Sequence, residues 1–266
     1  MAPRTIGLVL TFNGERLLAR CLRSLAFCDE IVVVDSLSTD ATVELAKAAG
    51  ATVLLRRWEG PGPQFRFALE HIRAMRPTVD WVVSLDQDES LTEELAANIR
   101  EAIAKDSGKD AAKDASNVGY WVPRSSHYFD RFMRHSGWYP DRLLRLFRPA
   151  RMEVHVSGAH YSFRPLGDTG RLTGDNIHFP YRNFREHLDK INSYAQQGAD
   201  DLRAKGRSGG VLRGIIHGLA RFAKLYLLKL GLLDGRAGFI NAVHGAFYAF
   251  LKYVRVEERG EWGPKP

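Results

Sequence analysis

The acidic run Asp86-Gln87-Asp88-Glu89 offers the side chains best suited to metal chemistry in this chain. It directly follows an apolar stretch, so two carboxylates at positions i and i+2 would both face a cleft if the chain turns there. Hard oxygen ligands of this kind suit Mg²⁺ or Mn²⁺, and either cation can bridge a diphosphate. The alternative is an acidic turn that only caps a helix beginning at Glu93, and the spacing alone favours that alternative.

The alternation of apolar runs with helical patterns predicts the elements that position these carboxylates. Strands are predicted over 5–11, 31–34, 51–55 and 81–85, and helices over 15–25, 41–49, 64–74 and 93–105. Continuous apolar strands with intervening helices indicate parallel βαβ units that are covered on both faces. Such sheets bind ligands beyond the carboxyl ends of their strands. The polar side chains predicted at that edge are Thr11, Asn13, Asp35, Asp86 and Asp88. Their shared position makes metal and diphosphate binding the favoured interpretation of the acidic run.

The composition of the 266 residues is that of a globular protein, with 45% hydrophobic and 26% charged residues, which argues against wholesale disorder. Cys21 and Cys28 are too few and too close together for a disulfide framework that would stabilise a chain of this size, so we expect a reduced, cytoplasmic setting. No run of about 18 or more apolar residues occurs, so no segment must span a bilayer. The net charge of +7 suits a nucleic acid, an anionic membrane surface or a phosphorylated substrate, without choosing among them.

Beyond residue 105 the pattern of the chain changes. Residues 106–117 are polar and rich in alanine, and we interpret them as a solvated loop. From Gly119 to about Tyr181 the pattern is strand-like, and the last third of the chain is helical. Between Arg124 and Arg151 arginines alternate with aromatic residues. This mixture suits single-stranded nucleic acid, and it equally suits an acceptor whose sugars stack on rings while its anionic groups meet guanidinium groups.

The segment Arg203–Arg255 contains ten Lys or Arg residues and one acid, Asp234. Apolar residues recur at helical spacing from Leu212 to Leu230, and basic residues follow a second face. A basic amphipathic helix of this kind is typical of helices that lie in an anionic membrane interface. The alternative is a helix packed on the rest of the protein with a solvated basic face. A turn at 234–238 is predicted to precede a second apolar helix over 239–253.

Six motifs in order carry a resemblance to a known family. The stretches 11–25 (TFNGERLLARCLRSL), 30–46 (EIVVVDSLSTDATVELA) and 81–91 (WVVSLDQDESL) resemble the nucleotide-binding half of family 2 glycosyltransferases, which have the GT-A fold. Within that family the chain is similar to the β-glycosyltransferases of the lipopolysaccharide core. The shared distal motifs are Gly137–Asp141 with Arg145–Phe147, Leu172 with Gly174 and His178, and Lys190–Ala195. The match extends to about Tyr253.

The resemblance implies an α/β, Rossmann-like GT-A sheet that binds a nucleotide-sugar, followed by amphipathic helices. We therefore predict a glycosyltransferase domain over 1–200, with a donor half over about 1–105 and an acceptor half over about 118–200. A basic, membrane-associating helical region would follow over 201–256, and a tail over 257–266.

The resemblance also implies a role for each matching residue. Contacts to the donor nucleotide are implied for Thr11, Asn13, Asp35 and Ser38. Asp86 would touch the ribose or the sugar and contribute to the metal site, and Asp88 would ligate the metal, Mg²⁺ or Mn²⁺. His178 would supply a further metal ligand or a phosphate contact. Arg66 stands where the family has asparagine, and it would either contact a phosphate or solvate a helix face.

The general base is the open point of this prediction. An inverting transfer needs a group that takes the proton of the acceptor hydroxyl as its oxygen attacks the anomeric carbon. The Val-His-Glu motif expected after the Arg-Leu-Phe segment is here Val154-His155-Val156, so the usual glutamate is replaced. We rank Asp141 first as the base, with pairing to Arg142 or Arg145 as its structural alternative, and Glu153 and His155 are the other candidates.

The function implied is inverting transfer of a hexose, preferably glucose, from a nucleotide-diphosphate sugar, preferably a UDP-sugar. The acceptor would be a lipid-linked sugar such as the lipopolysaccharide inner core, at the inner face of the cytoplasmic membrane, with no nucleic acid as a partner. One alternative is a nucleotidyltransferase on a similar fold, although such an enzyme is expected to have a Gly-rich, Lys- or Arg-containing loop after its first strand, and TFNGERLL is not one. The other is a non-enzymatic, basic nucleic-acid-binding protein.

Overall fold

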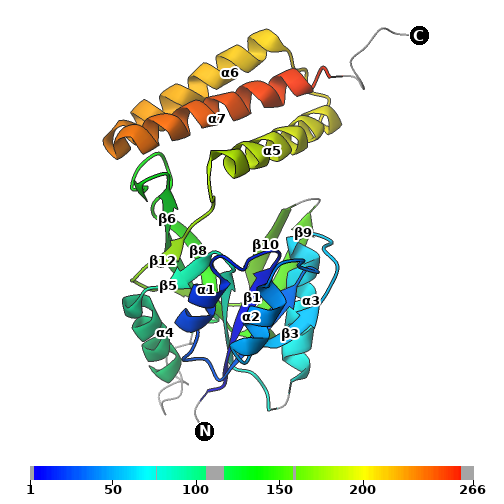
Figure 1. Cartoon of the computed structure of the whole chain (residues 1–266), viewed down its shortest axis with the longest axis vertical. Coiled ribbons are helices and arrows are strands. Elements are labelled where there is room, and N and C mark those ends of the chain that lie inside the picture. Colours follow the sequence, from blue (N-terminus) through cyan, green and yellow to red (C-terminus); the bar gives the residue numbers. More distant parts are fainter. Residues whose placement is uncertain (1–2, 76, 106–116, 158–159, 259–266) are drawn as a thin grey trace, which may run out of the picture. The chain divides into compact units, whose positions relative to one another are not determined.

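The computed structural model describes residues 3–75, 77–105, 117–157 and 160–258, which form two compact units (Figure 1). The first unit comprises the chain up to Ser125 together with Asp141–His178. The second comprises Ser126–Pro140 together with the chain from Phe179 onward. Nearly all of the loop predicted over 106–117, and most of the tail predicted over 257–266, lie outside the described residues.

The first unit is built on a mixed sheet with the strand order β3-β2-β1-β4-β8-β6-β12-β5, and β11 pairs with β6. The strands are β1 Thr5–Thr11, β2 Glu30–Asp35, β3 Thr52–Leu55, β4 Trp81–Asp86, β5 Glu89–Leu91, β6 Gly119–Tyr128, β8 Asp141–Phe147, β11 Thr169–Arg171 and β12 Asn176–His178. The first four strands are parallel, as predicted, whereas β8 runs antiparallel to both β4 and β6. The parallel strands therefore end at one common edge, where β1, β2 and β4 finish in Thr11, Asp35 and Asp86.

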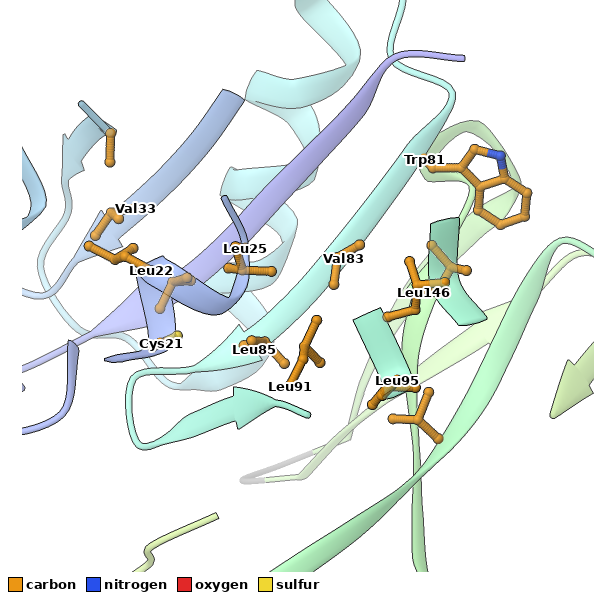
Figure 2. Packing of buried hydrophobic residues seen from close by; sticks show 14 of the residues in the cluster. Cys21, Leu22, Leu25, Val33, Trp81, Val83, Leu85, Leu91, Leu95 and Leu146 are labelled. Atoms are coloured by element: carbon orange, nitrogen blue, oxygen red, sulfur yellow. The ribbon is translucent and has the colours of Figure 1, made fainter. Parts of the chain in front are cut away.

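Helices pack on both faces of this sheet. Both faces receive side chains from every strand, because successive side chains of a strand point to opposite faces. The helices are α1 Leu18–Ser24, α2 Thr42–Ala48, α3 Pro61–Ala74 and α4 Glu93–Lys105, with a 3-10 turn, η1, at Pro149–Arg151. Val9, Val33 and Leu85 pack against α1, α2 and α4, in the core drawn in Figure 2. Ile6 and Val32 point the other way, onto α3. The continuous apolar runs of the sequence are thus explained by burial on two sides.

A two-stranded antiparallel sheet, β9 Met152–Ser157 with β10 His160–Pro165, lies beside α3. Phe163 of β10 packs edge-on against Phe65 of α3, with ring centroids 4.9 Å apart. The strand-like character predicted from Gly119 to about Tyr181 is confirmed by β6 to β12.

The second unit is mainly helical, as predicted for the last third of the chain. Its elements are the end of β6, β7 Arg131–Phe132, α5 Phe184–Ala204, α6 Val211–Ala223, a π-helical turn η2 at Lys224–Leu228, a 3-10 turn η3 at Gly231–Asp234, and α7 Gly235–Arg255. The amphipathic helix predicted up to Leu230 leaves α-helical geometry at Lys224. No helix within the described residues is long and apolar enough to cross a membrane.

One turn prediction was wrong. Gly238 does not turn the chain, since α7 already begins at Gly235 and runs through it. A side chain at Gly238 would place its Cβ within 1.8 Å of the Gly231 carbonyl oxygen. This glycine therefore permits a close approach of α7 to η3, and the turn itself uses Gly235, whose φ is 58°.

Candidate active site

Asp35 is the centre of a hydrogen-bond network where β1 and β2 end. Thr11 Oγ1 and Ser38 Oγ donate to Asp35 Oδ2 at 2.8 and 2.5 Å, and the Ser38 N–H donates to Oδ1 at 2.8 Å. Asp35 and Thr11 are buried. The structure thus brings three of the predicted donor-binding residues together, and Asp35 is bonded to its own chain there.

Asn13 belongs to the same network. Its N–H donates to Ser38 Oγ at 2.8 Å, and its side-chain oxygen accepts from the Thr39 N–H at 2.9 Å. These bonds fix the backbone of Asn13 at a φ of 49°, in the left-handed region that asparagine tolerates better than most residues. Four of the predicted nucleotide contacts, at positions 11, 13, 35 and 38, therefore form one cluster at the sheet edge.

Gln87 joins the acidic run to the end of β1. Its Oε1 accepts from the Phe12 N–H at 2.8 Å and its Nε2 donates to the Phe12 carbonyl at 2.9 Å. Gly14 lies beneath this side chain, because a Cβ there would stand 2.2 Å from Gln87 Oε1. A residue with a side chain at position 14 would not fit without moving Gln87.

The acidic run itself is organised by Arg145, which comes from β8. Arg145 Nη2 lies 2.7 Å from Asp86 Oδ2 and 2.5 Å from Glu89 Oε2. The Asp86 N–H also donates to Glu89 Oε2 at 3.1 Å. Burial acts to raise the pKa of Asp86, but the charge and hydrogen bond of Arg145, together with the charges of His178 and Arg124, hold that pKa below its usual value. Asp86 is therefore an ionised group at neutral pH.

A second arginine connects Glu89 to the predicted base. Arg124 Nη1 lies 3.5 Å from Glu89 Oε1, and Arg124 Nε and Nη2 donate to Asp141 Oδ2 at 3.0 and 2.5 Å. The side chains of Asp86, Glu89 and Asp141 are thus linked into one ionic chain through Arg145 and Arg124. Asp141 pairs with Arg124, and not with Arg142 or Arg145, the partners considered from the sequence.

Asp88 and His178 form a pair at the turn between β4 and β5. His178 lies on β12, which is antiparallel to β5 and places His178 opposite Glu89. His178 Nε2 is 3.6 Å from Asp88 Oδ2. Two ligands of one octahedral Mg²⁺ or Mn²⁺ stand about 3 Å apart when adjacent and about 4 Å apart when opposite. The separation of 3.6 Å lies between these two spacings, so the two side chains would have to move slightly to share one cation. No group of three or more His, Cys, Asp or Glu side chains arranged for a metal occurs within the described residues.

Cys21 lies beneath the acidic run, where its Sγ donates to the Asp86 carbonyl oxygen at 3.5 Å. Burial, and then the negative charges of Glu89, Asp86 and Asp88, raise the pKa of this thiol well above its usual value. A thiol held neutral in this way is a poor nucleophile. Cys21 therefore contributes packing, and not reactivity, to the site.

Three further predicted residues meet in a different place. Arg66, Glu153 and His155 line a pocket between α3 and β9, together with Glu70 and Arg73. Arg66 Nε is 3.4 Å from the Val154 carbonyl oxygen, which it can donate to. This pocket lies on the α3 face of the sheet, whereas the acidic run lies at the carboxyl end of β4.

From the sequence, Arg145 had no role in the metal site, and Gln87 and Glu89 had none beyond their membership of the acidic run. Arg145 entered the sequence analysis as part of the Arg145–Phe147 motif, among the arginines of the acceptor segment and as a partner of Asp141. Yet it lies in an apolar strand between Leu144 and Leu146, and all three are buried. A charged residue at an inward strand position requires a buried partner of opposite charge. That signal was present, although nothing local named Glu89 as the partner.

The site lies at the carboxyl edge of the parallel strands of an α/β fold, and its carboxylates suit a group-transfer enzyme. Residues 8–167 match the sequence profile of the family Glycosyl transferase family 2. The chain therefore belongs to glycosyl transferase family 2, and the predicted GT-A-type α/β fold is confirmed.

The chain is similar over nearly its whole length to a curated protein of Rhizobium meliloti, the lipopolysaccharide core biosynthesis glycosyltransferase LpsC. The two are 30% identical over 265 residues, which is 97% of this chain and 93% of LpsC. Among solved structures, the mannosyltransferase PcManGT of Pyrobaculum calidifontis, in complex with GDP-Man and Mn²⁺, aligns with a TM-score of 0.47 and 16% identity, over 96% of this chain and 87% of that one. The structure of S. aureus TarS 1–349 aligns with a TM-score of 0.38 and 19% identity, over 55% of this chain, and this chain spans about half (47%) of its length.

Proposed function

We propose that this protein transfers a hexose, preferably glucose, from a nucleotide-diphosphate sugar to a lipid-linked acceptor such as the lipopolysaccharide inner core, with inversion at the anomeric carbon. The observation that carries this proposal is the ionic chain from Asp86 through Arg145, Glu89 and Arg124 to Asp141. This ionic chain connects Asp86, on the donor side, with Asp141, on the acceptor side, in one rigid arrangement. The similarity to LpsC supports the choice of acceptor.

The nucleoside of the donor, preferably UDP, is assigned to the edge formed by Thr11, Asn13, Asp35 and Ser38. Because Asp35 already accepts three hydrogen bonds from Thr11 and Ser38, its main part is to hold these residues in place. Its Oδ1 accepts one of these bonds, and the remaining lone pair would meet a uracil N–H or a ribose hydroxyl only once the nucleotide opens this buried edge.

The metal is assigned to Asp88 and His178, with Asp86 beside them. Mg²⁺ and Mn²⁺ sites of this type use one or two carboxylates and complete their shell with substrate phosphates and water. When bound, such a cation would stabilise the negative charge that develops on the diphosphate as the glycosidic bond breaks. Asp88 and His178 supply one oxygen and one nitrogen ligand, and Arg145 keeps Asp86 ionised.

The base is assigned to Asp141. Within the described residues both of its contacts with Arg124 use Oδ2, so Oδ1 is left to accept the proton of the acceptor hydroxyl. Arg124 fixes the orientation of the carboxylate, which favours a single geometry of attack. Glu153 and His155 fit this role less well, because they line the pocket beside α3.

The acceptor that we propose is lipid-linked, so the enzyme would work at the anionic, cytoplasmic face of the inner membrane. Three arginines that the sequence suggested for acceptor binding are engaged within the first unit instead: Arg124 and Arg145 with carboxylates, and Arg148 over the ring of Trp81 at 4.4 Å.

The donor proposal is tested by calorimetric titration of UDP-glucose with and without Mn²⁺, on the wild type and on Asp88→Ala. We expect binding to the wild type to depend on Mn²⁺ and to weaken at least tenfold in Asp88→Ala, a loss of about 1.4 kcal/mol. The matched control is Glu101→Ala, which removes an exposed carboxylate on α4 whose ion pair, within the described residues, is with Lys105 at the surface. Equal, metal-independent binding by wild type and Asp88→Ala would refute the metal assignment.

The same titrations separate the two competing functions. A nucleotidyltransferase would bind UTP, with its triphosphate, in preference to UDP-glucose. A basic nucleic-acid-binding protein would keep a salt-sensitive affinity for RNA or DNA after Asp86 and Asp88 are replaced by alanine. The stereochemistry is checked by NMR of the first product formed, which should have the anomeric configuration opposite to that of the donor.

A further inference from the structure

The helical hairpin of the second unit exposes large apolar side chains along one stretch of chain. On α6 the exposed fractions are 70% for Leu212 and 68% for Leu219, with Ile215 and Ile216 also exposed between them. The turn after α6 continues the pattern, and Leu228 in η2 is 79% exposed. Contiguous exposed apolar surface of this kind on a folded protein marks an interaction site.

The way in which α6 packs explains why this surface is uncovered. Gly214 and Gly218 are spaced i, i+4 and are the buried residues of α6. A Cβ at Gly214 would stand 3.0 Å from the Phe250 carbonyl oxygen, and one at Gly218 would stand 3.2 Å from the Ala246 carbonyl oxygen. The helix therefore contacts the backbone of α7 through its glycines, and not through its leucines and isoleucines. This packing excludes the alternative in which the apolar face of α6 is buried against α7.

The apolar face of α6 continues onto α7. Phe222 of α6 and Phe239 of α7 have ring centroids 5.9 Å apart. Phe239, Val243 and Phe247 are exposed and recur every four residues, so they lie on one side of α7. Figure 1 shows α6 and α7 lying side by side. We call the exposed apolar residues of α6, the following turn and α7 the hairpin face; they are Val211, Leu212, Ile215, Ile216, Leu219, Leu227, Leu228, Leu230, Leu232, Leu233, Phe239, Val243 and Phe247.

The two helices and the turn that carry this face have charges of nearly one sign. From Val211 to Arg255 the chain has seven Lys or Arg residues and one acid, Asp234. Asp234 is buried, and its carboxylate accepts from the N–H groups of Arg134 and His135 at 3.2 and 2.9 Å, so it offers little charge to the surface. The basic residues on α6 and in the turn, which are Arg213, Arg221, Lys224 and Lys229, are exposed.

We propose that the hairpin face inserts into the interface of an anionic lipid bilayer, with the two helices parallel to the membrane plane and the basic residues among the lipid headgroups. This inference deepens the membrane part of the proposed function, since it names the surface that meets the lipid. Exposed leucines and isoleucines favour the acyl boundary, and exposed arginines and lysines favour anionic headgroups. A second copy of this chain would supply apolar surface, but it would bring the same positive charge to the contact.

The test is flotation of the full chain with vesicles that contain phosphatidylglycerol, compared with vesicles of phosphatidylcholine alone. The variant Leu212→Ser/Leu219→Ser removes apolar surface from residues that contact solvent, so its fold should be preserved. The matched control is Leu166→Ser/Leu188→Ser, which makes the same two changes at exposed leucines outside the hairpin face. UDP-glucose binding, measured in parallel, separates a failure of the membrane surface from a failure of the donor site.

We expect the wild type and the control to float with anionic vesicles, less so at high salt, and the hairpin variant to lose about tenfold in vesicle affinity per leucine. The proposal is overturned if the wild type does not float at low salt, or if the hairpin variant floats as well as the control. It is also overturned if neither protein binds vesicles and sedimentation velocity shows a dimeric wild type and a monomeric hairpin variant, because the hairpin face would then be a dimer interface.

Discussion

Replacing Arg145 by methionine is the sharpest perturbation of the site, because one guanidinium nitrogen of Arg145 contacts two carboxylates. Methionine has a similar length and no charge, so it keeps much of the packing between Leu144 and Leu146 and removes both ion pairs. The two carboxylates lose different amounts. The side chain of Glu89 is fully buried, whereas that of Asp86 is 39% exposed.

The magnitude follows from this difference in burial. Removing one partner of a buried ion pair costs about 3–5 kcal/mol, because an uncompensated charge remains in the interior. Arg124 still lies 3.5 Å from Glu89 and partly compensates it, so we expect about 3 kcal/mol of lost stability for Arg145→Met. The contact with Asp86 is screened by solvent and contributes at most about 1 kcal/mol.

The assay is urea unfolding followed by circular dichroism, on Arg145→Met alone and combined with Glu89→Gln or with Asp86→Asn. Neutralising the buried Glu89 should recover more than half of the lost free energy of unfolding, and neutralising Asp86 should recover little. A cost below about 1 kcal/mol for Arg145→Met, or equal recovery by the two second changes, would refute the inference that Arg145 compensates a buried Glu89.

Three other predictions concern single groups. Burial lowers the pKa of His187 to about 4, so between about pH 6.5 and pH 4 the unfolded chain binds a proton at this histidine that the native state does not bind. The stability of the second unit, complete above about pH 6.5, should therefore drop by about 3 kcal/mol as the pH falls over that range. The pH profile of urea unfolding should flatten in His187→Gln. Asp141→Asn should reduce transfer by about 10²–10⁴-fold while calorimetry finds donor binding unchanged, and full activity would eliminate Asp141 as the base. Gly14→Ala should displace Gln87 from Phe12 and cost about 1–2 kcal/mol in thermal unfolding, with an unchanged melting temperature counting against that contact.

The elements of the parallel half could be predicted from local pattern, because a strand that is buried on both faces appears in the sequence as an uninterrupted run of apolar residues. The run at 81–85 was observed as β4 Trp81–Asp86, and the helix predicted over 93–105 as α4 Glu93–Lys105. The start of α3 was predicted three residues late, since its first turn contains Gly62 and two prolines, which are weak helix signals in a sequence although proline suits the first turn.

The site was predictable only as a set of strand ends. That Thr11, Asp35 and Asp86 meet at one edge follows from parallel topology, which the alternation of elements indicates. The partners of these residues depend on pairings between distant strands. Arg145 faces the acidic run because β8 lies antiparallel beside β4, with Leu146 opposite Val83. His178 stands beside Asp88 because β12 pairs with β5.

Local periodicity and the ordered motifs encode the family, the alternating α/β half and the carboxylates at its edge. Which cation neutralises which carboxylate depends on the register between distant strands, and that register has no local signature in the sequence. The packing of the folded chain also determines whether the apolar stripe on α6 is exposed. The stripe indicates an amphipathic helix, but whether that face is covered depends on the packing of Gly214 and Gly218 against α7. Close packing through glycines leaves the larger apolar residues facing outward.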